Sequence, residues 1–142
     1  MKKLWLVGLV AVILCNCSKE NDGNSGSLPP LPDPDDVCSA MDNINFMTFC
    51  YEKFDANKDG KVSVREAEAV REIDFDKGLS GSLKGIERFP NLEILDCYSY
   101  HFGSGGYYSF SFAELDLRYN RMLKILRLYN CTNLVTLDLS RN

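Results

Sequence analysis

The sequence predicts an α/β fold, a short solenoid with a parallel β-sheet that is capped at its N-terminal end by a helical unit. An apolar pattern of the form L-x-x-L-x-L returns five times between residues 70 and 142, as in repeat architectures. Before it, apolar residues recur with helical spacing next to a polar, glycine-containing loop at 55–66. Because no single turn of a repeat array can bury its own apolar face, we expect neighbouring turns to stack.

The N-terminus has the composition of an export signal. Lys2 and Lys3 precede an apolar run at 4–14, which is about half as long as a membrane-spanning helix needs to be. We therefore expect residues 1–16 to be a signal peptide that is removed. Ordinary secretion, with cleavage by the general signal peptidase, is the alternative to the lipid attachment described next.

The residues after this run, L-C-N-C-S-K-E-N-D, resemble the lipobox of bacterial lipoproteins. Leu14 lies three residues before Cys17, as in that family, although Asn16 replaces the usual small residue. The resemblance implies acylation of Cys17, with Cys15 as the second choice. The acidic run after Cys17 is similar to the signal that sends lipoproteins of gut Bacteroidota to the outer surface. The expected location is the outer membrane, lipid-anchored and facing the cell exterior.

A tether is expected between the anchor and the folded part. Residues 17–36 are rich in Gly, Ser, Asn, Asp and Pro, a composition typical of a flexible or polyproline-like linker. The 142-residue chain has a net charge of −4 and no basic cluster, so we expect no nucleic-acid partner.

Residues 55–66, D-A-N-K-D-G-K-V-S-V-R-E, have oxygen-bearing side chains at positions 1, 3, 5, 9 and 12 and glycine at position 6. Ca²⁺ prefers six to eight oxygen ligands, and Gly60 permits the sharp turn that aims them inward. The loop resembles the calcium loop of the EF-hand family. The cofactor expected from this resemblance is Ca²⁺, and its ligands would be Asp55, Asn57, Asp59, the Lys61 carbonyl, Ser63 and Glu66.

Helix signals at 44–54 and 63–71 flank this loop. We expect residues 37–72 to form a helical cap over the first turn of the array, with calcium fixing the angle between the helices. Sensor EF-hands usually occur in pairs, so a single loop favours a structural ion over a switch.

The array is expected to span residues 70–142. Its five copies are Val70/Ile73/Phe75, Leu92/Leu95/Cys97, Phe112/Leu115/Leu117, Leu123/Leu126/Leu128 and Leu134/Leu137/Leu139. Their central members lie 22, 20, 11 and 11 residues apart, which predicts full turns for the first three copies and half turns for the last three. Asn120, Cys131 and Asn142 occupy the next inward position of the later copies. The pattern resembles the leucine-rich-repeat family, especially its short bacterial form; an ordinary antiparallel β domain is the alternative. The last copy ends at Asn142 without a polar cap, as expected for the first part of a longer array.

The stretch 98–112 interrupts the array with aromatic residues and glycines. Either these rings fill the core of an irregular turn, or they form an exposed platform for a protein or sugar partner. The candidate platform residues are Tyr98, Tyr100, Tyr107, Tyr108 and Phe110.

The predicted function is binding rather than catalysis. His101 is the only histidine, and no nucleophile, base and acid stand together in the sequence. The repeat resemblance implies a cell-surface protein that mediates protein-protein or adhesive interactions. A carbohydrate-binding accessory of a glycan-uptake system and a purely structural surface module are the alternatives. Cys38 and Cys50 could form a disulfide, whereas Cys97 and Cys131 are expected to be buried thiols.

Overall fold

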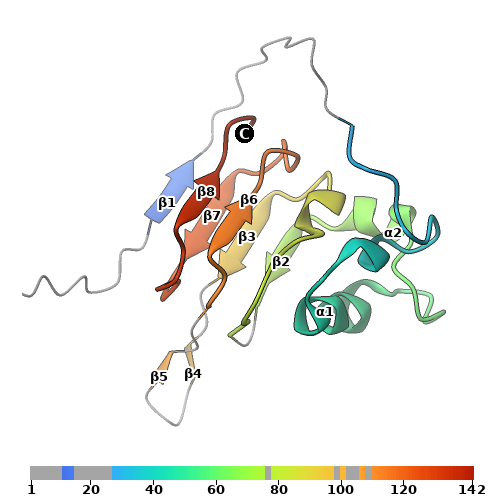
Figure 1. The fold of residues 1–142 in the computed structure, drawn as a ribbon, viewed down its shortest axis with the longest axis horizontal. Coiled ribbons are helices and arrows are strands. Elements are labelled where there is room, and N and C mark those ends of the chain that lie inside the picture. Colours follow the sequence, from blue (N-terminus) through green and yellow to red (C-terminus); the bar gives the residue numbers. More distant parts are fainter. Residues whose placement is uncertain (1–10, 15–26, 76–77, 98–99, 102–105, 108–109) are drawn as a thin grey trace, which may run out of the picture.

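The computed structural model of the chain describes residues 11–14, 27–75, 78–97, 100–101, 106–107 and 110–142. It is an α/β structure with small parallel sheets, in which the helices α1 and α2 lie beside β2, an edge strand of the first sheet (Figure 1). The helices are the 3₁₀ helices η1 (Val37–Ala40) and η2 (Ile86–Arg88) and the α-helices α1 (Ile44–Phe54) and α2 (Val64–Ala69). The strands are β1 (Ala11–Leu14), β2 (Glu72–Asp74), β3 (Ile94–Cys97), β4 (Tyr100–His101), β5 (Gly106–Tyr107), β6 (Glu114–Asp116), β7 (Ile125–Leu128) and β8 (Thr136–Asp138).

Both α-helices begin at polar caps. The Asn43 side chain accepts a hydrogen bond from the Asn45 amide, and α1 then runs over the predicted residues 44–54. Helix α2 is capped by Ser63 and begins at Val64, and it ends at Ala69 rather than at the predicted residue 71. The reason is that the Arg71 carbonyl accepts hydrogen bonds from the amides of Glu93 and Ile94, which places Arg71 in the strand ladder.

The first sheet contains three parallel strands in the order β7, β3, β2, and the antiparallel strand β1 lies on the far side of β7. Ile73 of β2 is in register with Leu95 of β3, which is in register with Leu126 of β7. These are the central apolar positions of three repeats, and all three side chains are buried. The second sheet pairs β6 with β8 in parallel, with Leu115 in register with Leu137.

The predicted assignment of full and half turns is therefore wrong at one copy. Leu115 does not stack on Leu95, because β6 belongs to the second sheet. The next strand on β3 is β7, 31 residues further along the chain rather than 20. From Leu115 onward, the central residues lie 11 positions apart and alternate between the two sheets. Leu115 and Leu137, which are 22 positions apart, therefore pair in the second sheet, whereas Leu126 lies in the first. The extra length between Leu95 and Leu126 contains the aromatic stretch, whose β4–β5 hairpin projects away from both sheets (Figure 1).

Asparagine side chains connect successive turns at one end of the strands. Asn120 is fully buried, and its amide donates to the carbonyls of Ile86 and Phe89 at 2.8 and 3.1 Å. Asn142 donates in the same way to the carbonyls of Leu117 and Asn120. Both asparagines therefore satisfy backbone carbonyls at the bends.

Aromatic rings join the helical unit to the strands. Phe75, which follows β2, is buried and packs against Phe46 and Phe49 of α1, with ring centroids 6.0 and 4.8 Å apart. On its other side it contacts Phe110, 5.9 Å away. This packing fixes α1 against the first repeat, and with it the loop that leaves the end of α1.

We expect Asn120→Ala to lower the free energy of unfolding by roughly 1 to 3 kcal/mol, because the carbonyls of Ile86 and Phe89 would each lose one of their two hydrogen bonds. The exposed Asn133, replaced by Ala, is the matched control and should change stability little. Urea unfolding measures both. Equal midpoints for the two variants would contradict a role of Asn120 in holding the turns together.

Candidate metal-binding loop

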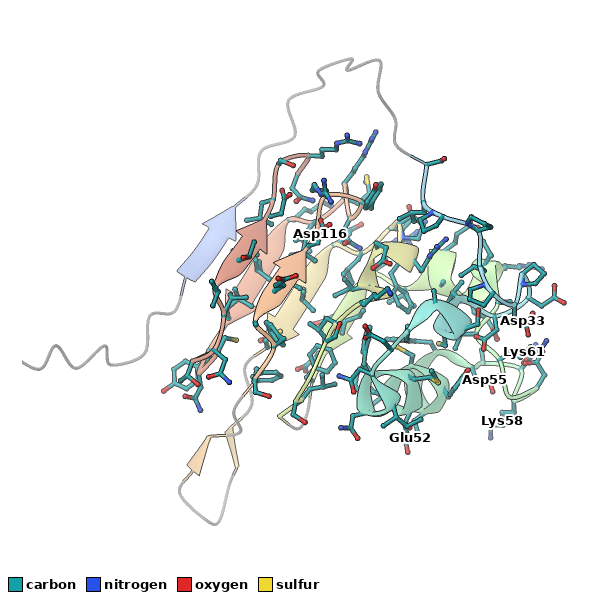
Figure 2. The ribbon with its side chains drawn as sticks, viewed as in Figure 1. Asp33, Glu52, Asp55, Lys58, Lys61 and Asp116 are labelled. Carbon is teal, nitrogen blue, oxygen red and sulfur yellow. The ribbon has the colours of Figure 1, made fainter. Side chains whose placement is uncertain are left out.

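The loop at 55–66 connects the C-terminal end of α1 to the N-terminal end of α2. Asp55 follows the last residue of α1, and Ser63 caps α2 through a reciprocal capping box with Glu66. Figure 2 shows Asp55, Lys58 and Lys61 together at this end of the molecule. The helices thus hold the first, ninth and twelfth positions of the predicted calcium loop.

Backbone geometry explains the glycine at position 6. Gly60 has a φ of +84°, and a Cβ built there would meet no atom within 4 Å. The glycine is therefore required by backbone conformation rather than by crowding. Lys58 also adopts a positive φ, of 59°, so the turn bends sharply at two positions.

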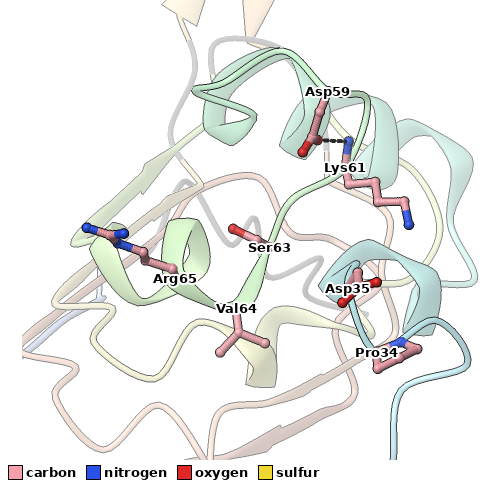
Figure 3. Close-up of a pocket in the computed structure, with 7 residues that line it drawn as sticks. All are labelled: Pro34, Asp35, Asp59, Lys61, Ser63, Val64 and Arg65. Atoms are coloured by element: carbon pink, nitrogen blue, oxygen red, sulfur yellow. Dashed lines mark hydrogen bonds between the residues drawn. The ribbon is translucent and has the colours of Figure 1, made fainter.

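The side chains on the first half of the loop point toward its own amides. The Asp55 carboxylate accepts hydrogen bonds from the amides of Asp59 and Gly60, at 3.2 and 2.9 Å. The Asn57 side-chain oxygen accepts from the Asp59 amide at 3.0 Å. Asp59 in turn accepts from the Lys61 amide at 3.0 Å (Figure 3). This arrangement orders three oxygen donors along the inside of the turn.

Glu66 closes the loop from its far end. Its Oε1 accepts from the amides of Ala56 and Asn57 at 2.9 and 3.2 Å, and its Oε2 accepts from the Ser63 amide and hydroxyl at 2.9 and 2.8 Å. The Ser63 amide is the main cause that lowers the pKa of Glu66 below its ordinary value, followed by the Ser63 hydroxyl. Glu66 is therefore ionised at neutral pH and reaches across to the start of the loop.

The donor set fits a hard cation such as Ca²⁺, because the predicted ligand positions offer oxygen from their side chains, or at Lys61 from the backbone carbonyl. Among the residues that the structure describes, however, no three His, Cys, Asp or Glu side chains converge closely enough to hold a metal ion. The carboxylates are instead turned onto loop amides, as described above. Ion binding therefore requires Asp59 and Glu66 to rotate toward Asp55.

An N-terminal segment, Asp33–Cys38, pairs with the second half of the loop, and the sequence did not reveal this. The Val37 amide donates to the Val62 carbonyl at 2.9 Å, and the Val62 amide donates to the Asp36 carboxylate at 3.2 Å. Lys61 forms an ion pair with Asp33 at 3.0 Å. Both the amide and the carbonyl of Val62 are thereby hydrogen-bonded to the N-terminal segment.

Asp36 is the centre of this contact. Its side chain is buried and also accepts from the Cys38 amide and, at 2.6 Å, from the Tyr51 hydroxyl of α1. Burial, reinforced by the hydrogen bond to Asp36, raises the pKa of Tyr51. The predicted linker at 17–36 is therefore too long at its C-terminal end, because Asp33 and Asp36 are bound to the folded part.

An open hollow of about 540 Å³ lies beside the loop (Figure 3). Its lining residues are Pro34, Asp35, Asp59, Lys61, Ser63, Val64 and Arg65. It is an open surface hollow rather than an enclosed cavity, and its lining carries charges of both signs.

The candidate aromatic platform is corrected at one residue. Phe110 is fully buried and packs on Phe75 and Phe112, so it belongs to the core and not to an exposed surface. Tyr100 and Tyr107 are backbone partners in the β4–β5 hairpin. Tyr98 and Tyr108 lie outside the described residues, as does the predicted lipidation site Cys17.

Within the described part of the chain, no helix is long and apolar enough to cross a membrane. The family models, the curated proteins and the solved structures compared with this chain gave no match. The fold and the loop together define an α/β protein with small parallel sheets and an oxygen-rich turn between two helices.

The lowered pKa of Glu66 predicts a pH dependence of stability in calcium-free buffer. A carboxyl whose pKa falls on folding contributes stability above its unfolded value, and this contribution is lost as the pH falls through the folded value. Glu66→Gln should therefore be less stable than the wild type at pH 7, and the difference should shrink as the pH falls below the ordinary value of 4.5. Urea unfolding across this pH range measures the stability difference, and the exposed Glu52→Gln is the control. A stability difference between Glu66→Gln and the wild type that did not change with pH would contradict the stabilising role of the Glu66 carboxylate.

Proposed function

We propose that this chain is a calcium-binding, lipid-anchored surface protein of the leucine-rich-repeat type that binds another macromolecule. The observation that carries the calcium proposal is the arrangement of the loop. Asp55, Asn57 and Asp59 line the inside of a turn that Gly60 makes possible, and Glu66 reaches back across it. The spacing of these oxygen donors supports the proposal, and a bound ion would have to draw their carboxylates away from the loop amides.

The ion is proposed to stabilise the protein rather than to switch it. The loop is already ordered by hydrogen bonds from its own amides, and it is attached to Asp33 and Asp36 on one side and to two capped helices on the other. Calcium would draw Asp55, Asp59 and Glu66 together and offset the repulsion between their charges. The backbone around the loop would need little rearrangement.

The repeat proposal is supported by the register of the strands. Ile73, Leu95 and Leu126 align in one sheet, and Leu115 and Leu137 align in the other. Asn120 and Asn142 bond the bends of neighbouring turns, as an asparagine ladder in a solenoid would. In this proposal the helical unit at 37–72 is the cap of the first turn, held there by the Phe75 ring contacts.

A binding role follows from the repeat proposal, because stacked turns present an extended surface. The outer face of the first sheet aligns Asp96 with Arg127, whose side chains form an ion pair of 2.7 Å. Such a row of in-register side chains is suited to contact with a protein partner. A spacer role is the alternative, and it predicts no saturable binding of the purified protein to cells.

Calcium should raise the melting temperature by several degrees. With a Kd of about 10 μM and about 1 mM Ca²⁺, binding adds roughly 2.7 kcal/mol to the stability of the folded state. Glu66→Gln removes one carboxylate oxygen and should abolish the shift between chelator and calcium. Glu52→Gln removes the same charge from an exposed position on α1 and should keep it. An undiminished shift in Glu66→Gln would exclude Glu66 as a ligand.

The lipid anchor is proposed from the sequence around Cys17. Cys17→Ala should leave the protein unacylated, because only this thiol would receive the diacylglycerol, whereas Cys15→Ala should change little. Metabolic labelling with a fatty-acid analogue measures both. Label that depends on Cys15 and not on Cys17 would move the mature N-terminus.

A further inference from the structure

Two cysteines lie in the buried core of the helical unit. Cys38 belongs to η1 and Cys50 to α1, both are fully buried, and both are free thiols in the structure. The helices η1 and α1 contact each other, and both thiols belong to the same buried apolar cluster. The neighbouring hydrogen bond between Tyr51 and Asp36 holds the same two segments together independently, at 2.6 Å.

We propose that Cys38 and Cys50 are a disulfide-forming pair that joins the N-terminal segment of the helical unit to α1. The segment that would be joined is the one that pairs with the predicted calcium loop through Val37 and Asp36. The crosslink would therefore hold in place the N-terminal segment that is hydrogen-bonded to the loop. This inference does not depend on calcium binding, since it rests on the position of the two thiols.

The chemistry needs an external disulfide of the glutathione type as oxidant. One thiolate attacks it, which forms a mixed disulfide and releases one thiol. The second thiolate then attacks the protein sulfur of the mixed disulfide, forms the Sγ–Sγ bond and releases the second thiol. In total the pair loses two protons and two electrons, and one molecule of oxidant is reduced to two thiols.

Burial decides when this reaction can occur. Removal from water, strengthened by the neighbouring Cys38, raises the pKa of Cys50 far above its ordinary value. The reactive thiolate is therefore scarce once the core has closed. Oxidation should take place during folding and should be slow in protein that has already folded in the reduced state.

The remaining core cysteines provide an internal comparison. Cys97 is buried in β3, and Cys131 directs its thiol to the Tyr129 carbonyl at 3.6 Å. Burial raises the pKa of Cys131 to about 11, and it also raises the pKa of Cys97 well above its ordinary value. We expect both to remain thiols under the conditions that oxidise Cys38 and Cys50.

Tryptic mapping separates these outcomes, because no Lys or Arg lies between Glu20 and Tyr51. Cys38 and Cys50 therefore fall in one peptide, residues 20–53, while Cys97 and Cys131 fall in two others. The full chain is unfolded, reduced, refolded with a mixture of oxidised and reduced glutathione, denatured and alkylated. Peptide 20–53 should be lighter than its reduced form by two hydrogen atoms and should carry no alkyl group, and the other two peptides should be alkylated.

A second measurement tests whether the crosslink stabilises the fold. A disulfide restricts the unfolded chain, so the oxidised wild type should melt several degrees above the reduced protein. Cys38→Ser, Cys50→Ser and the double variant should lose this dependence on oxidation, whereas Cys131→Ser should keep it. If a serine variant does not fold, the peptide map of the wild type still decides. Alkylation of both Cys38 and Cys50 after oxidative refolding would overturn the proposal.

Discussion

Parallel pairing of strands in register is the constraint on which the rest of this structure depends. The apolar side chains of one turn are covered only when the equivalent side chains of the next turn lie against them, as Ile73, Leu95 and Leu126 do. Stacking also brings the bends close together, where their carbonyls need donors. Asn120 supplies two of these hydrogen bonds from a fully buried position, so apolar packing and polar satisfaction impose the same alignment.

The helical unit takes its position from this stack. Phe75 follows β2, and its ring packs against rings of α1 and against the buried Phe110. This aromatic cluster links the helices to the strands. The loop then runs from Asp55 at the end of α1 to the Ser63 cap of α2. Its outer side is closed by Asp33 and Asp36, which bind Lys61 and the Val62 amide. A loop held on every side by the fold is suited to an ion that adds stability.

The hydrogen bonds of the loop also limit what a bound ion could contribute. Asp55, Asp59 and Glu66 already accept hydrogen bonds from backbone amides, and these bonds offset part of the repulsion between three nearby carboxylates. A cation must compete with these amides before it gains coordination energy. In the proposed site, the net effect of calcium would therefore be smaller than the gross attraction of three carboxylates for a divalent ion.

Local features of this protein could be predicted from the sequence, because they depend on neighbouring residues alone. Helical spacing and the Asn43 cap determine α1, the alternation of apolar residues identifies the inward positions of the strands, and the turn at Gly60 follows from sterics. Only tertiary structure decided which strands pair: Leu115 lies in the second sheet, and residues between β3 and β6 supply the additional length. It also decided that Asp33 and Asp36 close the loop and that Phe110 lies in the core. These outcomes depend on contacts between residues far apart in the chain. The local sequence pattern is compatible with several arrangements, and long-range packing and hydrogen bonding determine which one forms.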